Sequence, residues 1–329
     1  MFRIILLIII FFLFSFLLTY LFRYLAIRYK IYDIPGERSL HQAPVPRSGG
    51  LAIVISWYVG ITVLFFSGGI ERGLYLALMS GIIIAVVSFI DDIIKLSPLI
   101  RLIFQFCTAI AAFFFLGKLR PLIMPEIEIN YPLLIYPFAI IGMVWFINLF
   151  NFMDGVDGFA SIEAIIVSLV MFFYSNNIIN ILLIACVAGF LFWNWPKARI
   201  FMGDIGSTQL GFILVILGIY FHNNYKFSII NWIMLTSPFW FDATLTLFRR
   251  WRNKEKLSQA HRKHVYQRFV QSGASHLKTD MYLVLINAVI ILFILIYREF
   301  KVMQYIIPVI TLLFLYSITR YVDKKVPFK

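Results

Sequence analysis

The stretch Asn148-Leu149-Phe150-Asn151-Phe152-Met153-Asp154-Gly155-Val156-Asp157-Gly158 lies between two long apolar runs and carries two amides, two carboxylates and two glycines. Carboxylates at a membrane boundary are costly and mark function by default. Glycine permits sharp turns and a close approach to a ligand, and carboxylates suit Mg²⁺ or the hydroxyls of a polar substrate. A helix start would need only Asp154 or Asp157 as its N-cap. The second Asp and the two Asn therefore favour a functional site here.

Outward from this stretch, the composition is that of a polytopic membrane protein. Of the 329 residues, 61% are hydrophobic and 14% are charged, whereas about a quarter of a soluble domain is charged. A net charge of +13 would suggest nucleic acid in a soluble protein. Here the excess of Lys and Arg on the cytoplasmic side explains it, so no nucleic-acid partner is expected. Cys107 and Cys186 fall inside apolar runs and are expected to be packing residues.

Apolar runs of spanning or near-spanning length predict an all-α polytopic fold, one membrane domain over residues 1–329 with about 11 transmembrane helices. Polar and apolar residues alternate in the outer segment Leu119–Tyr131, which favours a short periplasmic strand or β-hairpin. The runs are Ile4–Phe22, Leu51–Phe66, Leu74–Ile90, Ile100–Gly117, Pro132–Ile147, Phe159–Tyr174, Ile178–Trp195, Thr208–Phe221, Ser228–Phe248, Thr279–Tyr297 and Met303–Thr319.

The distribution of Lys and Arg predicts the orientation. With the N-terminus outside, 22 of these residues fall in inner segments and 7 in outer ones, which favours N-out, C-in. Every polar cluster then lies on the cytoplasmic face. The inner loops are predicted at 23–50, 91–99, 148–158, 196–207 and 249–278.

The first two inner clusters each allow a structural and a functional interpretation. Arg38, His41 and Arg47 could hold phosphate, although an ordinary basic loop would carry the same charges. Asp91 and Lys95 are four residues apart and could form an ion pair on a helix. The adjacent carboxylates Asp91 and Asp92 repel each other, however, which raises the proton affinity of one and makes it a candidate general base.

The remaining clusters carry an acid, an aromatic residue and histidines. Asp204 lies between two glycines, ahead of Ser207 as a candidate N-cap, and Phe201 suits either a membrane-interface anchor or a stacking platform. The run from His261 to Arg268 holds two histidines three apart, but no third soft ligand for zinc is near. A group of His, Lys and Arg suits a diphosphate better. Glu163 and Asp242, acids within the apolar runs, would either reach the site or pair with a neighbour.

Together these clusters resemble the polyprenyl-phosphate N-acetylhexosamine-1-phosphate transferases, which include the MraY and WecA types. The resemblance extends from Asp33 to Gly273. The pattern His-x-x-His-x-Tyr-Gln-Arg resembles the WecA-like or O-antigen-initiating branch. It departs from the three consecutive histidines of the muramoyl-pentapeptide branch, which favours a simple UDP-N-acetylhexosamine over a pentapeptide substrate.

The resemblance implies a reaction and its place. N-acetylhexosamine-1-phosphate passes from a UDP-N-acetylhexosamine to undecaprenyl phosphate, and UMP is released. The product would initiate a cell-envelope glycan such as the O-antigen of lipopolysaccharide. The enzyme would lie in the bacterial cytoplasmic (inner) membrane with its active site on the cytoplasmic face. Mg²⁺ is the implied cofactor, with Mn²⁺ as an alternative ion, and the resemblance is compatible with a homodimer.

The resemblance also implies residue roles. Asp204 would be the chief metal ligand, with Asp92 as a second, and Asp91 would be the base acting on the lipid phosphate. Phe201 would stack on uracil. The implied catalytic set is Asp91, Asp92, Asp154, Asp157, His261 and His264. The implied substrate-binding set is Asn148, Asn151, Phe201, Lys95, Arg262, Arg268, Arg47 and His41.

A multi-span transporter of a polar anionic solute is the main alternative, since it would share this composition. Transporters place ionisable residues deep within their spans and show internal repeats. Here the acids gather at one face, and the sequence shows no repeat. A scaffold protein would not need five polar clusters on one side. The transferase is therefore favoured.

Overall fold

Helices make up most of the computed structural model, which describes residues 2–36, 40, 43–124, 127–129, 131–257, 259, 261–300 and 302–328. Two short antiparallel pairs of strands accompany them. The helices are α1 (Phe2–Arg28), α2 (Gly50–Phe66), α3 (Arg72–Met79), α4 (Ile82–Ile94), α5 (Pro98–Leu116), α6 (Pro132–Phe152), α7 (Phe159–Ser175), α8 (Ile178–Asn194), α9 (Asp204–Asn223), α10 (Ile229–Leu235), α11 (Ser237–Arg252), α12 (Val265–Gln271), α13 (His276–Glu299) and α14 (Met303–Lys325). The strands are β1 (Tyr32–Asp33), β2 (Val45–Pro46), β3 (Leu122–Met124) and β4 (Ile127–Ile129).

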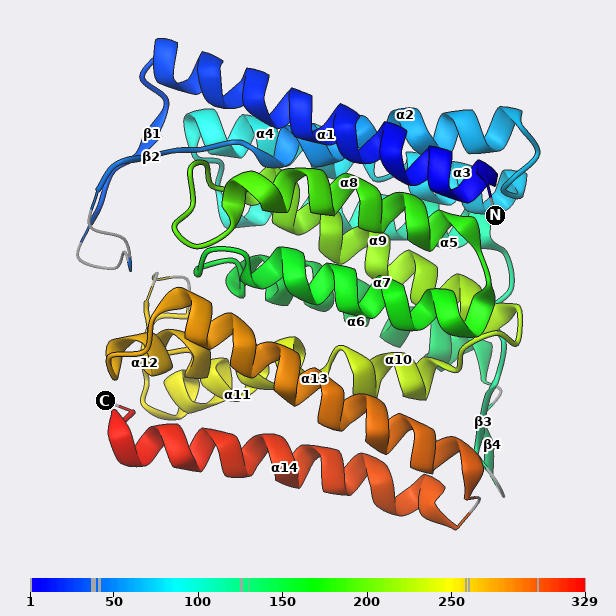
Figure 1. The fold of residues 1–329 in the computed structure, drawn as a ribbon. Helices are drawn as coiled ribbons and strands as arrows, with labels where there is room; N and C mark the ends of the chain where they lie inside the picture. The colour runs from blue at the N-terminus through cyan, green and yellow to red at the C-terminus, as the bar shows by residue number, and fades with distance from the viewer. Residues whose placement is uncertain are drawn as a thin grey trace.

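By length and composition, seven helical segments could cross a membrane, and α2, α7 and α8 are shorter apolar helices. This confirms the all-α polytopic prediction. Figure 1 shows the long helices side by side, with the N-terminus and the β3–β4 hairpin at one end of the bundle. The C-terminus, β1, β2 and α12 lie at the opposite end, called the polar end below. Which end faces the cytoplasm stays a prediction.

Two predicted spans are interrupted helices. The run Leu74–Ile90 divides into α3 and α4 near Gly81, where an added Cβ would lie 2.3 Å from Phe212 Cε1. The run Ser228–Phe248 divides into α10 and α11 beside Pro238, which has no N–H for the helical bond. The Ser237 hydroxyl donates instead to the Met234 carbonyl at 2.6 Å. That bond satisfies, inside an apolar environment, an acceptor that proline leaves free.

Several predicted loops are partly helical. α6 continues to Phe152, so Asn148 and Asn151 belong to its last turns and not to a loop. α4 continues to Ile94, which makes Asp91 and Asp92 helical as well. The loop predicted at 249–278 contains α12, and α9 begins at Asp204 with Gly203, not Ser207, at its N-cap. Charged residues at a membrane boundary end an apolar run without ending the helix.

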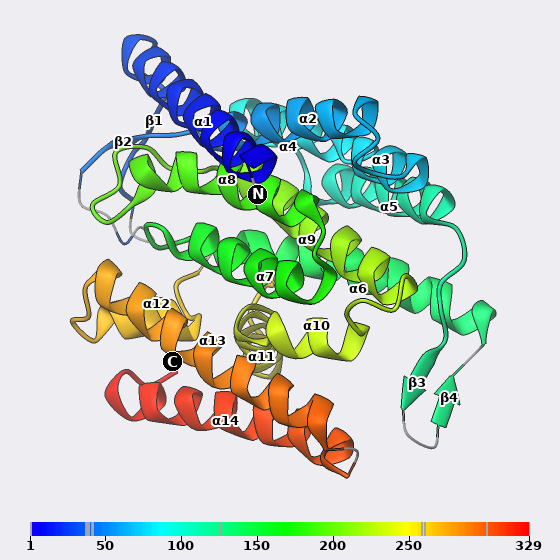
Figure 2. The same cartoon turned by 45° about the vertical axis from the view of Figure 1, so that its right-hand side comes forward.

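The outer segment confirms the predicted hairpin. β3 and β4 pair antiparallel, with Leu122 opposite Ile129, and the hairpin extends away from the helices in Figure 2. The cysteine prediction holds for one residue only, because Cys186 is buried whereas Cys107 is exposed on α5. A helix at the edge of a membrane bundle can be apolar on its outer face, so apolar surroundings in sequence did not imply burial.

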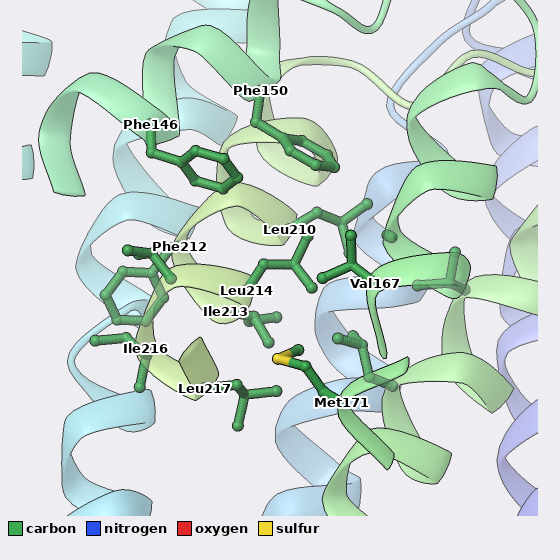
Figure 3. Close-up of a cluster of buried hydrophobic side chains, with 14 of the residues drawn as sticks. Phe146, Phe150, Val167, Met171, Leu210, Phe212, Ile213, Leu214, Ile216 and Leu217 are labelled. Atoms are coloured by element: carbon green, nitrogen blue, oxygen red, sulfur yellow. The ribbon is translucent and has the colours of Figure 1, made fainter. Parts of the chain in front are cut away.

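The core is built around α9, whose side chains are nearly all buried. Figure 3 shows Leu210, Ile213, Leu214 and Leu217 among side chains of α6 and α7. At its first turn α9 meets α2 so closely that a Cβ on Gly50 would lie 2.5 Å from Gly206 Cα. Small residues permit such backbone approach between membrane helices. This packing fixes where α9 begins, and so fixes Asp204 at the polar end.

Candidate active site

A cavity of about 330 Å³ opens at the polar end, between the ends of α4, α6 and α9. Its walls bring together seven residues that the sequence singled out: Arg47, Asp92, Asn151, Asp154, Asp157, Phe201 and Asp204. The other residues of its lining are Asp33, Leu40, Gly155, Val156, Asn194, Met202, Gly203, Gln267 and His276. Most of the lining is polar, and acids outnumber bases.

Hydrogen bonds and close contacts with neighbouring residues hold the turn between α6 and α7 in place. The Tyr266 hydroxyl donates to the Phe152 carbonyl at 3.0 Å, and a Cβ on Gly155 would lie 2.4 Å from that hydroxyl oxygen. Gly158 has a φ of +77°, and its N–H donates to Asn194 Oδ1 at 2.9 Å. Both glycines are thus required by the fold itself: Gly155 by close approach and Gly158 by its left-handed backbone.

The turn between α6 and α7 presents two carboxylates to the cavity. Asp157 Oδ2 accepts from the Ala198 N–H at 3.1 Å and lies 3.0 Å from His276 Nδ1. The pKa of Asp154 is raised well above its ordinary value, by burial first and then by the charges of Asp204, Asp157 and Asp92. Repelling carboxylates around one cavity favour a bound cation or a proton between them.

The start of α9 meets the end of α4. A Cβ on Gly203 would lie 3.0 Å from Asp92 Oδ2, an oxygen that is buried without a hydrogen-bond partner in the described part of the chain. The Arg47 guanidinium donates to the backbone carbonyl of Asp92. Nearby, the Ser207 hydroxyl donates to Asn151 Oδ1 at 2.6 Å. This Asp92 oxygen is therefore a buried acceptor beside the start of α9.

A second cavity of about 290 Å³ adjoins the first, and Arg47, Asp92 and Asp204 belong to both linings. Its remaining walls are Asp91, Lys95, Leu96 and Arg101. Arg101 Nη1 lies 2.8 Å from Asp91 Oδ2 and 3.5 Å from Asp204 Oδ2. Arg101 was not predicted as a site residue, although its place one helical turn into α5 beside Asp91 and Lys95 was visible in the sequence.

The sequence allowed an ion pair of Asp91 with Lys95 as one of two interpretations, but Asp91 pairs with Arg101 instead. α4 ends at Ile94, and Lys95 has a φ of +52°, so Lys95 leaves the helix face that four-residue spacing assumes. It lines the second cavity instead.

The other predicted residues lie away from both cavities or outside the described residues. Asn148 is hydrogen-bonded to Gln105, with its Nδ2 donating to Gln105 Oε1 at 2.7 Å. His41, like Arg38, falls outside the described residues. His261, Arg262, His264 and Arg268 line neither cavity. From the same loop region, Gln267 and His276 do so instead.

Several members of the histidine loop contact other parts of the protein. The backbone N–H of His264 donates to Gln267 Oε1 at 3.4 Å, and its Nδ1 lies 3.6 Å from Asp242 Oδ1. Arg268 Nη1 donates to Asp323 Oδ1 at 2.7 Å. Burial, followed by the charges of His264 and Arg250, lowers the pKa of His261 to about 3. His261 is therefore neutral at physiological pH.

Asp242 and Glu163 also pair with neighbours. Asp242 accepts from the N–H groups of Val265 at 2.8 Å and Tyr266 at 3.2 Å, which fixes the start of α12. Asn287 Nδ2 donates to Glu163 Oε2 at 2.7 Å in the buried contact between α13 and α7. Asp280, a third acid inside a predicted span, is 1% exposed.

The site suits a Mg²⁺ ion that protein carboxylates and substrate phosphates would bind together, and not one enclosed by protein ligands alone. Among the described residues, no three His, Cys, Asp or Glu side chains are grouped to hold a metal. Mg²⁺ is typically bound by one or two carboxylates together with substrate phosphates and water. Asp204 and the unpartnered Asp92 oxygen, at the junction of the two cavities, supply such a pair.

Comparisons with known proteins show which proteins this chain resembles in sequence. The family model described as glycosyl transferase family 4 matches residues 74–222, which include the ends of α4, α6 and α9. A probable undecaprenyl-phosphate N-acetylglucosaminyl 1-phosphate transferase of Bacillus subtilis (strain 168) is 30% identical over 285 residues, covering 82% of this chain and 78% of the relative.

Two further relatives carry related names. A decaprenyl-phosphate N-acetylglucosaminephosphotransferase of Mycolicibacterium smegmatis is 26% identical over 300 residues, covering 77% of this chain and 72% of the relative. A phospho-N-acetylmuramoyl-pentapeptide-transferase of Streptococcus sanguinis is 29% identical over 213 residues, covering 58% of this chain and 65% of the relative.

Proposed function

The chain belongs to glycosyl transferase family 4, within the polyprenyl-phosphate N-acetylhexosamine-1-phosphate transferase superfamily, and from that premise we propose its specific reaction. It transfers N-acetylhexosamine-1-phosphate from a UDP-N-acetylhexosamine to undecaprenyl phosphate and releases UMP. The observation that carries this proposal is the pair of adjoining cavities that share Arg47, Asp92 and Asp204. A transfer between two anionic substrates needs two such sites meeting at one wall.

The two cavities differ in a way that matches the two substrates. The larger one is lined by amides, carboxylates and the ring of Phe201, groups that suit the hydroxyls, amide and base of a nucleotide sugar. The smaller one places the cations Arg47, Lys95 and Arg101 around one space, beside three carboxylates, and the three cations suit a phosphate. We assign the nucleotide sugar to the first and the lipid phosphate to the second.

The reaction is then a single displacement at the shared wall. An oxygen of the lipid phosphate attacks the β-phosphorus of the UDP-sugar, and the bond from that phosphorus to the bridging oxygen breaks. The bridging oxygen leaves on UMP with the electron pair. Asp91, 9% exposed and paired with Arg101, accepts any remaining proton of the lipid phosphate, whose second pKa is about 6 by analogy with phosphorylated side chains.

Mg²⁺, or Mn²⁺ in its place, is the proposed cofactor. Asp204 and Asp92 would hold it, and when bound it supplies positive charge that offsets the repulsion between the two phosphates. Arg47 and Arg101 already stand at the same wall. They contribute the part of that charge that the chain itself provides.

The pathway and the membrane side follow from sequence features and remain proposals. The pattern from His261 to Arg268 supports a WecA-like substrate and a role in initiating a cell-envelope glycan such as O-antigen. The excess of Lys and Arg at the polar end supports a cytoplasmic active site in the bacterial inner membrane.

The deciding experiment measures UMP release by the purified protein in detergent, with a panel of UDP-N-acetylhexosamines, undecaprenyl phosphate and Mg²⁺. We expect turnover with at least one sugar, loss of turnover with a chelator, and no UMP without lipid. A burst of UMP equal to the enzyme concentration in the absence of lipid would contradict direct displacement in favour of a covalent intermediate. Solute uptake without UMP release would favour a transporter.

A further inference from the structure

His276 is the first residue of α13 and lines the nucleotide-sugar cavity. Its place is fixed by its neighbour Ser275, whose hydroxyl oxygen accepts from the Lys278 N–H at 3.2 Å and so caps the helix. It stands outside the histidine loop from His261 to Arg268 and outside the residues that the family model matches. Nothing in the proposed displacement uses it.

His276 and a backbone amide hold one oxygen of Asp157 from two sides. Nδ1 lies 3.0 Å from Asp157 Oδ2, and the Ala198 N–H donates to the same oxygen at 3.1 Å. A longer contact of 3.4 Å joins the Asp157 N–H to Nδ1. The ring of His276 thus touches both the backbone and the carboxylate of Asp157 and ties the two together.

The other oxygen of Asp157 is left for a ligand. Among the described residues, no hydrogen bond uses Asp157 Oδ1, and the side chain is 11% exposed at the cavity wall. A carboxylate that is fixed through one oxygen can offer the second in a set direction. Such pre-organisation lowers the cost of binding a donor group.

The surroundings explain why Asp157 needs this support. Asp154 stands three residues earlier in the same turn, and the charges of the two carboxylates repel. Asp280, one turn beyond His276 on α13, is a second nearby acid, since its Oδ2 would lie 3.3 Å from a Cβ on Gly158. Both oxygens of Asp280 are buried without a partner in the described chain. The contact with His276 holds Asp157 in place among these acids.

We propose that His276 is a positioning residue of the nucleotide-sugar site: with the Ala198 amide it holds Asp157 Oδ2, so that Oδ1 accepts a hydrogen bond from an N–H or O–H group of the substrate. This inference rests on the proposed function for the identity of the substrate. It predicts an effect on binding of the nucleotide sugar and not on the lipid phosphate, whose cavity His276 does not line.

Two substitutions of His276 distinguish the roles of its two ring nitrogens, Nδ1 and Nε2. The side-chain amide of Asn reaches the place of imidazole Nδ1, whereas that of Gln reaches the place of Nε2. His276→Asn should therefore keep the bond to Asp157 and a KM for the UDP-sugar within about threefold of the native value. His276→Gln should raise that KM roughly tenfold or more, the worth of a hydrogen bond to a charged group, with kcat and the KM for lipid nearly unchanged.

Binding measurements make the test independent of turnover. Calorimetry with the UDP-sugar on each detergent-purified variant should show the same order, His276→Asn tighter than His276→Gln, and parallel titrations with UMP locate the contact. A loss with both ligands places the Asp157 contact on the nucleotide, and a loss with the UDP-sugar alone places it on the sugar. Native protein that binds the UDP-sugar but releases no UMP would reject the proposed function and leave the positioning role standing.

Lys278→Gln is the matched control, because the exposed side chain of Lys278 lies on the same helix, two residues away, and lines neither cavity. Its KM should stay near the native value. Equal losses in His276→Asn and His276→Gln, mainly in kcat, would overturn the proposal in favour of chemistry at Nε2. Unchanged binding in both variants would overturn it altogether. Double substitution of Asp157 and His276 should cost no more than Asp157→Asn alone.

Discussion

Two regions were predicted to serve one site: the wall that the two cavities share, and the histidine loop. In the structure the wall lines both cavities, whereas His261, His264 and Arg268 line neither. Asp91, Asp92 and Asp204 stand at the ends of packed helices and line the second cavity together. The loop residues His264 and Arg268 are buried against partners of their own. A side chain at the end of a core helix is aimed by packing, whereas a side chain in a long loop is aimed by whichever distant group it meets.

The first prediction tests the wall where the effect should be largest. Asp204→Asn should lower kcat/KM by roughly 10²–10³-fold, a loss typical of removing one electrostatic stabiliser from a transition state. Asn keeps the shape of Asp but loses the charge that holds a hard cation. The thermal midpoint in detergent serves as the check of folding. A stable variant with near-normal turnover would remove Asp204 from the metal site.

The second prediction tests the histidine loop, where a substitution should lower the stability of the protein more than the activity of the folded molecule. Arg268 is 2% exposed and shares Asp323 with Arg249. Arg268→Gln should lower the free energy of unfolding by about 2–4 kcal/mol, because Asp323 keeps only one partner. Activity per folded molecule should stay within a few-fold of the native value.

The same pair offers a control for the second prediction. Asp323→Asn should cost a similar amount, and the double variant should cost less than the sum of the two. A stable Arg268→Gln protein that has lost activity would return Arg268 to the substrate-binding set that its sequence pattern implies, and the contrast between wall and loop would fail.

The third prediction sharpens the division of the wall itself. Arg101→Gln removes the cation that joins Asp91 to Asp204 and leaves the larger cavity intact, since Arg101 does not line it. The KM for undecaprenyl phosphate should rise roughly 10-fold, as expected for a lost charge-assisted hydrogen bond to phosphate. The KM for the UDP-sugar should change little. The reverse pattern would exchange the two substrate assignments.

The same contrast between packed helices and long loops explains which features could be predicted from the sequence. Apolar runs predicted the membrane helices because burial in lipid depends on composition over many residues. The order of the clusters placed Asp92, Asp154, Asp157 and Asp204 in one cavity, since each follows or begins a span at the same end. Those inferences needed no knowledge of which helix touches which.

The missed features depend on contacts between distant residues. The interruption near Gly81 involves a close contact with Phe212. Asp91 pairs with Arg101 and not with Lys95, because α4 ends before Lys95. His276 looked like an ordinary helix start after Ser275. One signal was present: His276, Asp280 and Asn287 recur at helical spacing on α13, and both Asp280 and Asn287 are 1% exposed. A polar stripe on a membrane helix indicates a buried face.

The fourth prediction concerns the smallest effect, the acid sensitivity that His261 gives to the loop. Burial and the neighbouring cations lower the pKa of His261 to about 3, whereas the unfolded chain has a pKa near 6.5. Between these values the unfolded state binds a proton that the folded state does not. Stability therefore falls as pH drops from about 6.5 toward 3, and the contribution is constant above about pH 7.

His261→Gln removes this penalty without adding a charge. Its thermal midpoint relative to the native protein should be higher at pH 5 than at pH 8, and the difference should be small because the ring is only partly buried. Kinetics should show no titration attributable to His261 between pH 6 and 8, where the imidazole is already neutral. A native pH–rate profile whose acidic limb disappears in His261→Gln would instead mean that the ring titrates during turnover. The loop would then belong to the reacting site as fully as the wall.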